Sequence, residues 1–403
     1  MTPHSGWKTL ADLDLSGRLA FVRCDFNVPL DEERRITDDT RMRATLPTLE
    51  RLRSSGARTI LVSHLGRPKG VRNPAYGLAP IAEHLAGILG QDVPLAPDCV
   101  GPEAAALARD IQPGAFLMLE NLRFHSGEEE NDEEFARALA SPADVYVNDA
   151  FGCSHRAHAS VARIVKFLRP AAAGLLLDRE LDVLGRLMED PERPVAAILG
   201  GAKVSDKLAV IESLMDRVDR ILIGGAMAFT FLKAEGRTVG ESLVEDDWVE
   251  TAGRLLRASE EKGCEIILPI DCVAAERFAA DADHRTVGLD ECPGSWMGLD
   301  VGPKTVDRFQ QALADARTIV WNGPVGVFEM EAFSRGTYAL AECVAASDAT
   351  TIIGGGDSVA AIQRAGAADK VSFISTGGGA FLEWLEGKEL PGVAALKEAA
   401  EDD

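Results

Sequence analysis

The sequence predicts an α/β fold in which two doubly wound, Rossmann-like parallel-sheet domains are joined by a hinge helix. The chain has 403 residues, which is long for one hydrophobic core, so we expect two domains. Short apolar runs recur along it, each followed by turn residues and then by helical periodicity. These runs are continuously apolar rather than alternating, which is typical of parallel strands covered on both faces.

The expected strands form two sets. The first set is "RLAFVRCD" (18–25), "ARTILVSH" (57–64), "AFLMLEN" (115–121) and "DVYVNDA" (144–150). The second set is "VAAILGG" (195–201), "RILIGGA" (220–226), "EIILPID" (265–271), "RTIVWNG" (317–323), "TTIIGGG" (350–356) and "VSFISTGGG" (371–379). Because ligands bind at the carboxyl ends of parallel strands, the polar residues after these runs are the candidate site residues.

The segment "AGLLLDRELDVLGRLMEDPERP" separates the two sets and predicts a connecting helix. Leu177, Leu181, Leu184 and Met188 follow helical spacing, and two prolines close the segment. The expected divisions of the chain are an N-terminal domain (1–172), a hinge helix (173–192), a C-terminal domain (193–379) and a last segment (380–403).

Composition limits the possible partners and the compartment. The net charge of −22 argues against nucleic acid or an anionic membrane as a partner, because both need a basic face. A site for an anionic substrate must therefore be built locally. The seven cysteines contain no CxxC pair, which favours reduced thiols over a disulfide framework or zinc ribbon. With neither a signal-peptide pattern nor a membrane-length apolar run, we expect a cytoplasmic protein.

The first half carries the residues of an anion site. In "VRCDFNVP", strand alternation places Arg23, Asp25 and Asn27 together on one face at the carboxyl end of the run. Basic residues that follow this and later strands are Arg41, Arg43, His64, Arg67, Arg123, His155, Arg156 and His158. Arginine forks match phosphate and carboxylate oxygens, so the pattern predicts a site for a small, multiply charged anion.

Two other patterns in the first half are not expected to form a ligand site. His155 and His158 have a spacing that could suggest a metal, but no carboxylate or cysteine cluster of ligand spacing accompanies them. The acidic run "GEEENDEE" (127–134) is expected to be a solvated loop and helix start.

The second half carries glycine-rich strand-to-helix turns that suit phosphates. In "ILGGAKVSDKLAVIESL", Lys203 and Lys207 lie one turn apart on the expected helix, near its N-terminus, where a phosphate would stabilise both. The alternative is that Lys207 pairs with an acid such as Asp206 on a wet surface. In "TIIGGGDSVAAI", Asp357 or Ser358 could cap the next helix, or Asp357 could bind a magnesium ion.

Two further loops, "STGGGAFLEWLEG" and "WNGPVGVFEMEAF", follow strands of the same set and are expected to lie at the same edge of the sheet. The common nucleotide fingerprints are absent, since the sequence contains neither a P-loop nor G-x-G-x-x-G. A P-loop NTPase and a standard dinucleotide dehydrogenase are therefore disfavoured.

Several of these motifs, taken together, are specific enough to indicate a protein family. "FVRCDFNVPL", "SHLGRPKG", "LENLRFH", "HRAHAS", "LGGAKVSDK", "WNGPVGVFE", "GGGDS" and "STGGGA" stand in the order of the phosphoglycerate kinase family, which the chain resembles from about residue 7 to 397. The resemblance implies reversible transfer of the acyl phosphate of 1,3-bisphosphoglycerate to ADP, giving 3-phosphoglycerate and MgATP in glycolysis. It also implies direct in-line transfer after the two domains close at the hinge.

The resemblance implies a role for individual residues. The glycerate would be bound by Asp25, Asn27, Arg41, His64, Arg67, Arg123 and Arg156. The nucleotide would be bound by Lys203, Lys207, Gly224, Gly225, Gly298, Leu299, Asn322, Glu329, Gly355, Gly356, Asp357 and Ser358, with Asp357 as the Mg²⁺ ligand. Transfer itself would rest on Arg41, Lys203, Gly378 and Gly379. A monomer is implied, with residues 380–403 packing back on the first domain.

Two alternatives stay open. Another small-acid kinase, such as an acetate-kinase-like enzyme, would leave Asp25 and Asn27 without a substrate hydroxyl to bind. A non-catalytic binding protein on the same fold would be favoured by loss of Arg41, Lys203 or Asp357, and all three are present. The spacing of "DECPGSWMGLD" before the expected adenine loop leaves the adenine contacts open.

Overall fold

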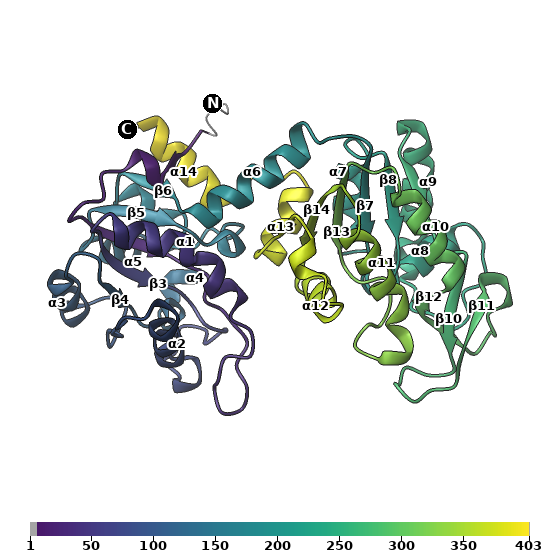
Figure 1. The fold of residues 1–403 in the computed structure, drawn as a ribbon, viewed down its shortest axis with the longest axis horizontal. Coiled ribbons are helices and arrows are strands. Elements are labelled where there is room, and N and C mark those ends of the chain that lie inside the picture. Colours follow the sequence, from purple (N-terminus) through teal and green to yellow (C-terminus); the bar gives the residue numbers. More distant parts are fainter. Residues whose placement is uncertain (1–5, 403) are drawn as a thin grey trace. The chain divides into compact units, whose positions relative to one another are not determined.

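A computed structural model describes residues 6–402, and the chain divides into two compact units (Figure 1). Unit 1 comprises Met1–Val183 and Glu389–Asp403, and unit 2 comprises Leu184–Lys388. Each unit contains a parallel sheet of six strands, so the predicted α/β class with two parallel sheets is confirmed. All ten expected runs contain a strand.

Unit 1 is built on a sheet with the order β1-β6-β5-β2-β3-β4. The strands are β1 (Lys8–Thr9), β2 (Leu19–Arg23), β3 (Arg58–Val62), β4 (Phe116–Met118), β5 (Val145–Asn148) and β6 (Ala171–Ala173). Its helices are α1 (Thr40–Ser54), α2 (Ala79–Leu89), α3 (Pro102–Asp110), α4 (Ser126–Glu129), α5 (Glu133–Ala140) and α14 (Pro391–Asp402). Every residue of β2, β5 and β6 is buried, because both faces of the sheet are covered.

The end of β2 differs from the expectation. The strand stops at Arg23, and the Phe26 amide donates to the Ser63 hydroxyl (2.9 Å) instead of continuing the ladder. The predicted alternation therefore fails beyond Arg23, and Asp25 and Asn27 lie on the loop that follows the strand. Arg23 itself is fully buried.

The predicted connecting helix is α6 (Leu175–Glu189), and the boundary between the two units falls within it. Asp149, the residue after β5, binds the first turn of α6. Its carboxylate accepts hydrogen bonds from the amides of Leu176 (2.9 Å) and Leu177 (3.2 Å). Near the end of the chain, α14 packs against β1 and β6 of unit 1. Figure 1 shows α14 beside β6. Residues 380–388, which the sequence grouped with this helix, belong instead to unit 2.

Asp149 makes the stability of unit 1 depend on pH. Its carboxyl is fully buried, and burial raises its pKa to about 7. Because the pKa is higher in the folded than in the unfolded protein, this group contributes most below about pH 4 and loses that contribution as the pH rises through 7. Between pH 4 and 8, we expect the wild type to lose roughly 2–4 kcal/mol more of its free energy of unfolding than Asp149→Asn loses. Urea denaturation at each pH measures this, and equal pH profiles would contradict it.

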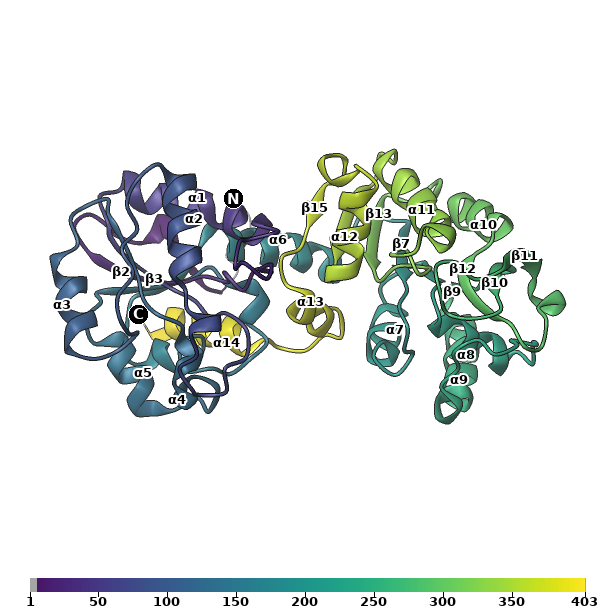
Figure 2. The ribbon, with the colours of Figure 1, turned by 90° about the horizontal axis from the view of Figure 1, so that it is seen from below.

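Unit 2 is built on a sheet with the order β15-β14-β13-β7-β8-β9. The strands are β7 (Val195–Leu199), β8 (Arg220–Ile223), β9 (Glu265–Ile267), β13 (Thr318–Asn322), β14 (Thr350–Gly354) and β15 (Phe373–Ile374). The helices are α7 (Leu208–Leu214), α8 (Met227–Ala234), α9 (Val249–Lys262), α10 (Pro303–Leu313), α11 (Arg335–Ala345), α12 (Gly356–Arg364) and α13 (Gly378–Leu385). Figure 2 shows α13 close to α7, which it contacts.

A second sheet of unit 2 was not predicted. It is antiparallel, with the order β11-β10-β12, and consists of β10 (Asp271–Ala275), β11 (His284–Gly288) and β12 (Met297–Val301). The sequence "HRTVG" of β11 is polar and mostly exposed, so it lacks the continuous apolar signal that identified the other strands.

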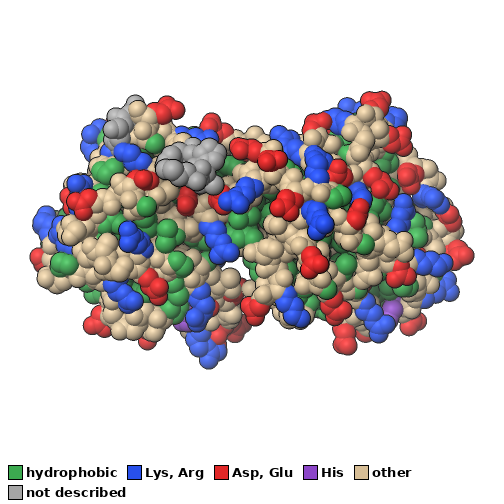
Figure 3. All heavy atoms as spheres, turned by 45° about the horizontal axis from the view of Figure 1, so that its top comes forward, with side chains coloured by type: hydrophobic (Ala, Val, Ile, Leu, Met, Phe, Trp, Pro, Cys, Tyr) green, Lys and Arg blue, Asp and Glu red, His purple; other side chains and the backbone are tan. Residues whose placement is uncertain are grey.

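The remaining expectations from composition concern thiols and membranes. All seven cysteines are free. Among residues 6–402, the structure contains no helix with the length and apolarity needed to cross a bilayer. Lys and Arg side chains are interspersed with Asp and Glu on the visible surface of each unit (Figure 3).

Candidate active site

The polar residues of unit 1 gather where its parallel strands end. Asp25 and Asn27 follow β2, His64 follows β3, Arg123 follows β4, and Arg156 follows β5. These strands are neighbours in the order β5-β2-β3-β4, so their carboxyl ends share one edge of the sheet. The structure thus brings together loops that are more than 100 residues apart in sequence.

Arg41, from the first turn of α1, is held by the loop after β2. Its Nη1 lies 3.3 Å from Asp25 Oδ2 and donates to the Asn27 carbonyl at 3.0 Å. The Asn27 side chain in turn accepts from the Gly66 amide at 2.8 Å. Because the Arg41 side chain remains one-third exposed, it can offer its other N–H groups to a ligand.

Arg123 joins the same cluster from the 3₁₀ turn η3 (Leu122–Phe124). Its Nη1 donates to the Gly66 carbonyl at 2.8 Å, and its Nε lies 3.3 Å from Glu129 Oε1. Gly66 is therefore contacted by both Asn27 and Arg123, which fixes the loop after β3 between them. Gly66 has φ +62°, and a Cβ there would lie 2.4 Å from the Tyr76 ring, so this close packing requires glycine.

Arg23 was placed on the polar face of its run by the sequence, but no role was assigned to it. The guanidinium is fully buried, donates from Nε to Ser160 Oγ (2.8 Å), and lies 3.3 Å from His64 Nδ1. Ser160 Oγ donates to Glu128 Oε1 at 2.6 Å, and the Ser160 amide donates to Glu128 Oε2 at 2.9 Å. The prediction that the run 127–134 is solvated is thus wrong for Glu128, whose side chain is fully buried and balances Arg23.

The electrostatics of this cluster suit an anion. Burial lowers the pKa of His64 well below its ordinary value, and the charges of Arg23, Arg123 and Arg41 lower it further. Burial and nearby arginines also lower the pKa of His158, to about 3. Both imidazoles are therefore neutral at pH 7, because the guanidinium charges already make the region positive.

A metal ion fits this cluster poorly. Donor atoms of Asp25, His64 and Cys153 lie within 4.8 Å of one another, the proximity that a metal site needs. However, the Arg23 guanidinium lies within 3.5 Å of both His64 Nδ1 and Cys153 Sγ. A divalent cation there would meet a buried positive charge, so the site favours a negatively charged ligand.

Arg67 and Arg156 are less closely tied to the cluster. Both are exposed. The charge of Arg156 lowers the pKa of Arg123 and of His158, which places it beside the cluster. Arg67 lies on the loop after β3, and within residues 6–402 no hydrogen bond or ion pair joins its side chain to the other site residues.

In unit 2, Asn322 at the end of β13 connects the candidate phosphate residues. Its Oδ1 accepts a hydrogen bond from Lys207 Nζ, and its Nδ2 donates to the Gly354 carbonyl at 2.8 Å. Burial lowers the pKa of Lys207 to about 8, whereas the charges of Asp206 and Asp357 act to raise it. The surface ion pair considered for Lys207 is thus wrong, since its ammonium is buried against an amide oxygen.

Lys203 does not share a helix face with Lys207. The helix α7 begins at Leu208, so both lysines precede it, and Lys203 is exposed. The intervening turn is held by Glu245, which accepts hydrogen bonds from the Ser205 amide (2.9 Å) and hydroxyl (2.7 Å). These bonds hold the chain in a turn, and Lys203 stays free to reach a ligand.

The glycine loops of unit 2 allow close backbone approach. Gly323 has φ +97°, and a Cβ there would lie 2.2 Å from the Gly200 carbonyl oxygen. A Cβ on Gly378 would lie 3.8 Å from Gly355 Cα and Gly356 N, so the loops after β14 and β15 are neighbours. Their amides can therefore face one ligand.

The residue that caps the helix after β14 differs from the prediction. Helix α12 begins at Gly356 with Gly355 as its N-cap, and neither Asp357 nor Ser358 caps it. The buried Ser358 hydroxyl instead accepts from the Gly323 amide (2.6 Å) and ties two loops together. Asp357 is exposed in the first turn, where its carboxylate is accessible to a cation.

The expected adenine residues line one small cavity. Gly225, Gly298 and Leu299 contribute to it, together with Phe229 of α8 and Val325, which sequence reasoning missed. Gly224 abuts Val325, since a Cβ there would lie 2.5 Å from its side chain. Glu329 is exposed on the loop that passes Leu299, where the Val327 amide donates to the Leu299 carbonyl at 2.9 Å.

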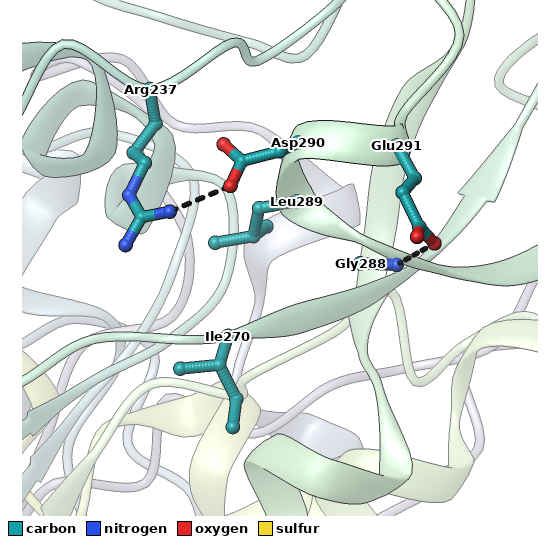
Figure 4. A pocket seen from close by; sticks show the side chains of 6 residues that line it. All are labelled: Arg237, Ile270, Gly288, Leu289, Asp290 and Glu291. Carbon is teal, nitrogen blue, oxygen red and sulfur yellow. Dashed lines mark hydrogen bonds and ion pairs between the residues drawn. The ribbon is translucent and has the colours of Figure 1, made fainter.

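A different pocket of about 190 Å³ lies beside the second sheet of unit 2 (Figure 4). It is lined by Arg237, Ile270, Gly288, Leu289, Asp290 and Glu291. Its arginine is already paired, with Arg237 Nη1 2.8 Å from Asp290 Oδ2, and Figure 4 shows these side chains pointing toward each other. Because it includes none of the residues assigned above, we do not place the active site there.

Comparison with known proteins gives one consistent family. The family model described as phosphoglycerate kinase matches residues 10–388. "Phosphoglycerate kinase" of Moorella thermoacetica is 57% identical, covering 97% of this chain and 99% of that protein. "Phosphoglycerate kinase, cytosolic" of Triticum aestivum is 54% identical over 97% and 98%. The solved phosphoglycerate kinase of Coxiella burnetii covers 98% of this chain and 100% of its own with a TM-score of 0.89 and 40% identity.

Proposed function

The chain belongs to the phosphoglycerate kinase family, and on that premise we propose that it catalyses the reversible transfer of the acyl phosphate of 1,3-bisphosphoglycerate to ADP, the glycolytic reaction that gives 3-phosphoglycerate and ATP. The observation that carries this proposal is the arginine cluster of unit 1, in which Arg23 and Arg123 are buried and Arg41 is partly exposed. In a chain of net charge −22, such a cluster is built for an anion.

The proposed glycerate site uses Arg41, Arg123, Arg156 and Arg67 for the charged oxygens, with Asp25 and Asn27 for the hydroxyl and carboxyl groups and His64 beside them. Arg41 and Arg123 are supported most directly, because the loops that hold them share the contacts at Gly66. The proposed nucleotide site uses Lys207, Asn322 and the neighbouring glycine loops for phosphates, with Lys203 reaching in from its exposed turn.

Magnesium would be held by Asp357 together with nucleotide phosphates. The residues fit such an ion, because a single exposed carboxylate beside a phosphate-binding loop is a typical Mg²⁺ arrangement. When bound, the ion neutralises phosphate charge.

Phosphoryl transfer mainly requires the enzyme to position the reactants and to stabilise the charge on the transferring group. The departing group is a carboxylate, which is already a good leaving group, so no general base is required. We assign Arg41 and Lys203 to the charge of the transferring phosphoryl group, supplemented by the amides of Gly378 and Gly379. Because the two sets of residues belong to different units, we propose that the units close about α6 for direct transfer and exclude water.

Two further properties, the cellular location and the oligomeric state, are also proposed. A cytoplasmic location follows the relative from Triticum aestivum, whose name includes "cytosolic". A monomer is proposed from the resemblance to the phosphoglycerate kinase family.

A coupled assay tests the function directly. We expect ATP consumption that requires both 3-phosphoglycerate and Mg²⁺, and no consumption with acetate in its place. Turnover of acetate without turnover of 3-phosphoglycerate would support a different small-acid kinase, and no turnover of either would support a binding protein.

A further inference from the structure

A second polar cluster of unit 1 combines Asp98, Cys99 and His125. One ligand atom from each lies within 4.8 Å of the others. His125 Nε2 is 2.7 Å from Asp98 Oδ1. None of the three was assigned a role from the sequence, because His125 is separated from the other two by α3 and β4.

We propose that this cluster binds one borderline-soft divalent metal ion, for which Zn²⁺ is the best match. A thiolate, an imidazole and a carboxylate are the three donor types that zinc uses in proteins, and three such ligands leave a fourth position for water. Mg²⁺ prefers oxygen donors alone, so it matches this set poorly. The proposal is independent of the proposed kinase reaction.

Backbone hydrogen bonds hold Asp98 and Cys99 in place, and a ring contact holds His125. The loop with Asp98 and Cys99 is attached to β4, because the Ala96 amide donates to the Met118 carbonyl at 2.8 Å. The Cys99 amide also donates to Asp98 Oδ1 at 2.7 Å. On the opposite side, the His125 ring stacks on Phe135 with 5.2 Å between centroids. Ligands held in this way keep their geometry before the metal arrives.

The distances need only a small adjustment. In a tetrahedral zinc site, oxygen and nitrogen ligands at about 2.0–2.1 Å from the metal are about 3.3 Å apart. Asp98 Oδ1 and His125 Nε2 would therefore separate by about 0.6 Å from their 2.7 Å hydrogen bond as the ion replaces the shared proton. The side chains of His125 and Asp98 are 32% and 38% exposed, which gives an ion access, while Cys99 is buried behind them.

The charges around this cluster differ from those of the arginine site. One guanidinium approaches, with Arg72 Nη1 3.9 Å from Asp98 Oδ2, the oxygen that does not contact His125. Arg72 is also shared with Glu120 (3.7 Å) and donates to the Pro97 carbonyl (2.5 Å). Its positive charge is thus partly balanced by Glu120, and it can orient Asp98 as an outer partner of the metal.

Cobalt binding to the full-length, untagged chain tests the proposal. After removal of metals with a chelator, we expect one equivalent of Co²⁺ to produce a thiolate-to-cobalt charge-transfer band and the strong visible absorption of tetrahedral cobalt. Zn²⁺ should displace it, and excess Mg²⁺ should not. Cys99→Ser should abolish the charge-transfer band, and His125→Asn should weaken Co²⁺ binding by at least about tenfold.

Two matched variants serve as controls. His84→Asn removes a histidine that pairs with Asp39 at 2.9 Å but that, within residues 6–402, has no cysteine ligand beside it. Cys343→Ser removes a partly exposed thiol of unit 2. Both should bind Co²⁺ as the wild type does. Zn²⁺ should also raise the melting temperature of the wild type and of these controls, but not that of His125→Asn.

Three results would overturn the proposal: no charge-transfer band in the wild type, an equal band in Cys99→Ser, or unchanged affinity in His125→Asn. If Cys99→Ser does not fold, the partly exposed His125 position decides the question through affinity and melting temperature.

Discussion

Arg41→Ala is expected to lower kcat by about 100- to 1000-fold, the cost of removing one charged donor from a developing negative charge. Arg41 is fixed from one side, by Asp25 Oδ2 at 3.3 Å and by the Asn27 carbonyl at 3.0 Å. Its exposed N–H groups are then pre-positioned for the transferring phosphoryl group. Steady-state kinetics with saturating ATP and 3-phosphoglycerate measure the effect.

The chain offers a matched control two residues away. Arg43 also lies in the first turns of α1, but its Nε pairs with Asp39 at 2.9 Å and its side chain is 60% exposed. Arg43→Ala should keep kcat within about twofold, because removal of an exposed ion pair has little energetic effect. Equal losses in both variants would indicate damage to α1, and turnover near wild type in Arg41→Ala would contradict the assignment.

The regular parts of the fold could be predicted because their signals are local. The ten predicted strands lie in continuous apolar runs, and α6 has four apolar residues at helical spacing, so neither signal depends on distant partners. The strand β11 could not be predicted in this way, because its polar residues are held by antiparallel pairing with β10. The position of Lys203 was also missed, because the turn before α7 depends on Glu245, forty residues away.

The candidate site was predictable in its motifs but not in its internal contacts. Asp25, Asn27 and Arg41 stand in recognisable segments, and the structure brings them together. Glu128 looked like part of a solvated acidic run, since nothing local shows that Ser160 and Arg23 surround it. The charges of Arg23 and Glu128 are linked through Ser160, and this contact between distant parts of the chain cannot be read from the periodicity of a single sequence.

Arg23→Met is expected to lower the free energy of unfolding by about 3–5 kcal/mol, the cost of breaking one side of a buried charge pair. The Arg23 guanidinium is fully buried and also donates to the Cys24 carbonyl and to Ser160 Oγ (2.8 Å). Burial raises the pKa of Glu128, and the charge of Arg23 acts against that rise. Without Arg23, the buried Glu128 carboxylate loses the larger of the two arginine charges that lower its pKa, and only that of Arg123 still acts in that direction. Protonation of Glu128 then becomes more favourable, and the cost of keeping its carboxyl buried grows with pH.

The double variant Arg23→Met/Glu128→Gln separates this explanation from a simple loss of packing. Gln removes the buried negative charge and keeps an oxygen that can accept from Ser160, so part of the stability should return. Urea denaturation of the four proteins in the cycle should give a coupling energy above about 1 kcal/mol. Additive losses would instead mean that Arg23 stabilises unit 1 through its packing and its other hydrogen bonds. Coupling would show that the charges of Arg23 and Glu128 stabilise unit 1 jointly, and the same guanidinium lies 3.3 Å from His64 Nδ1 in the anion site.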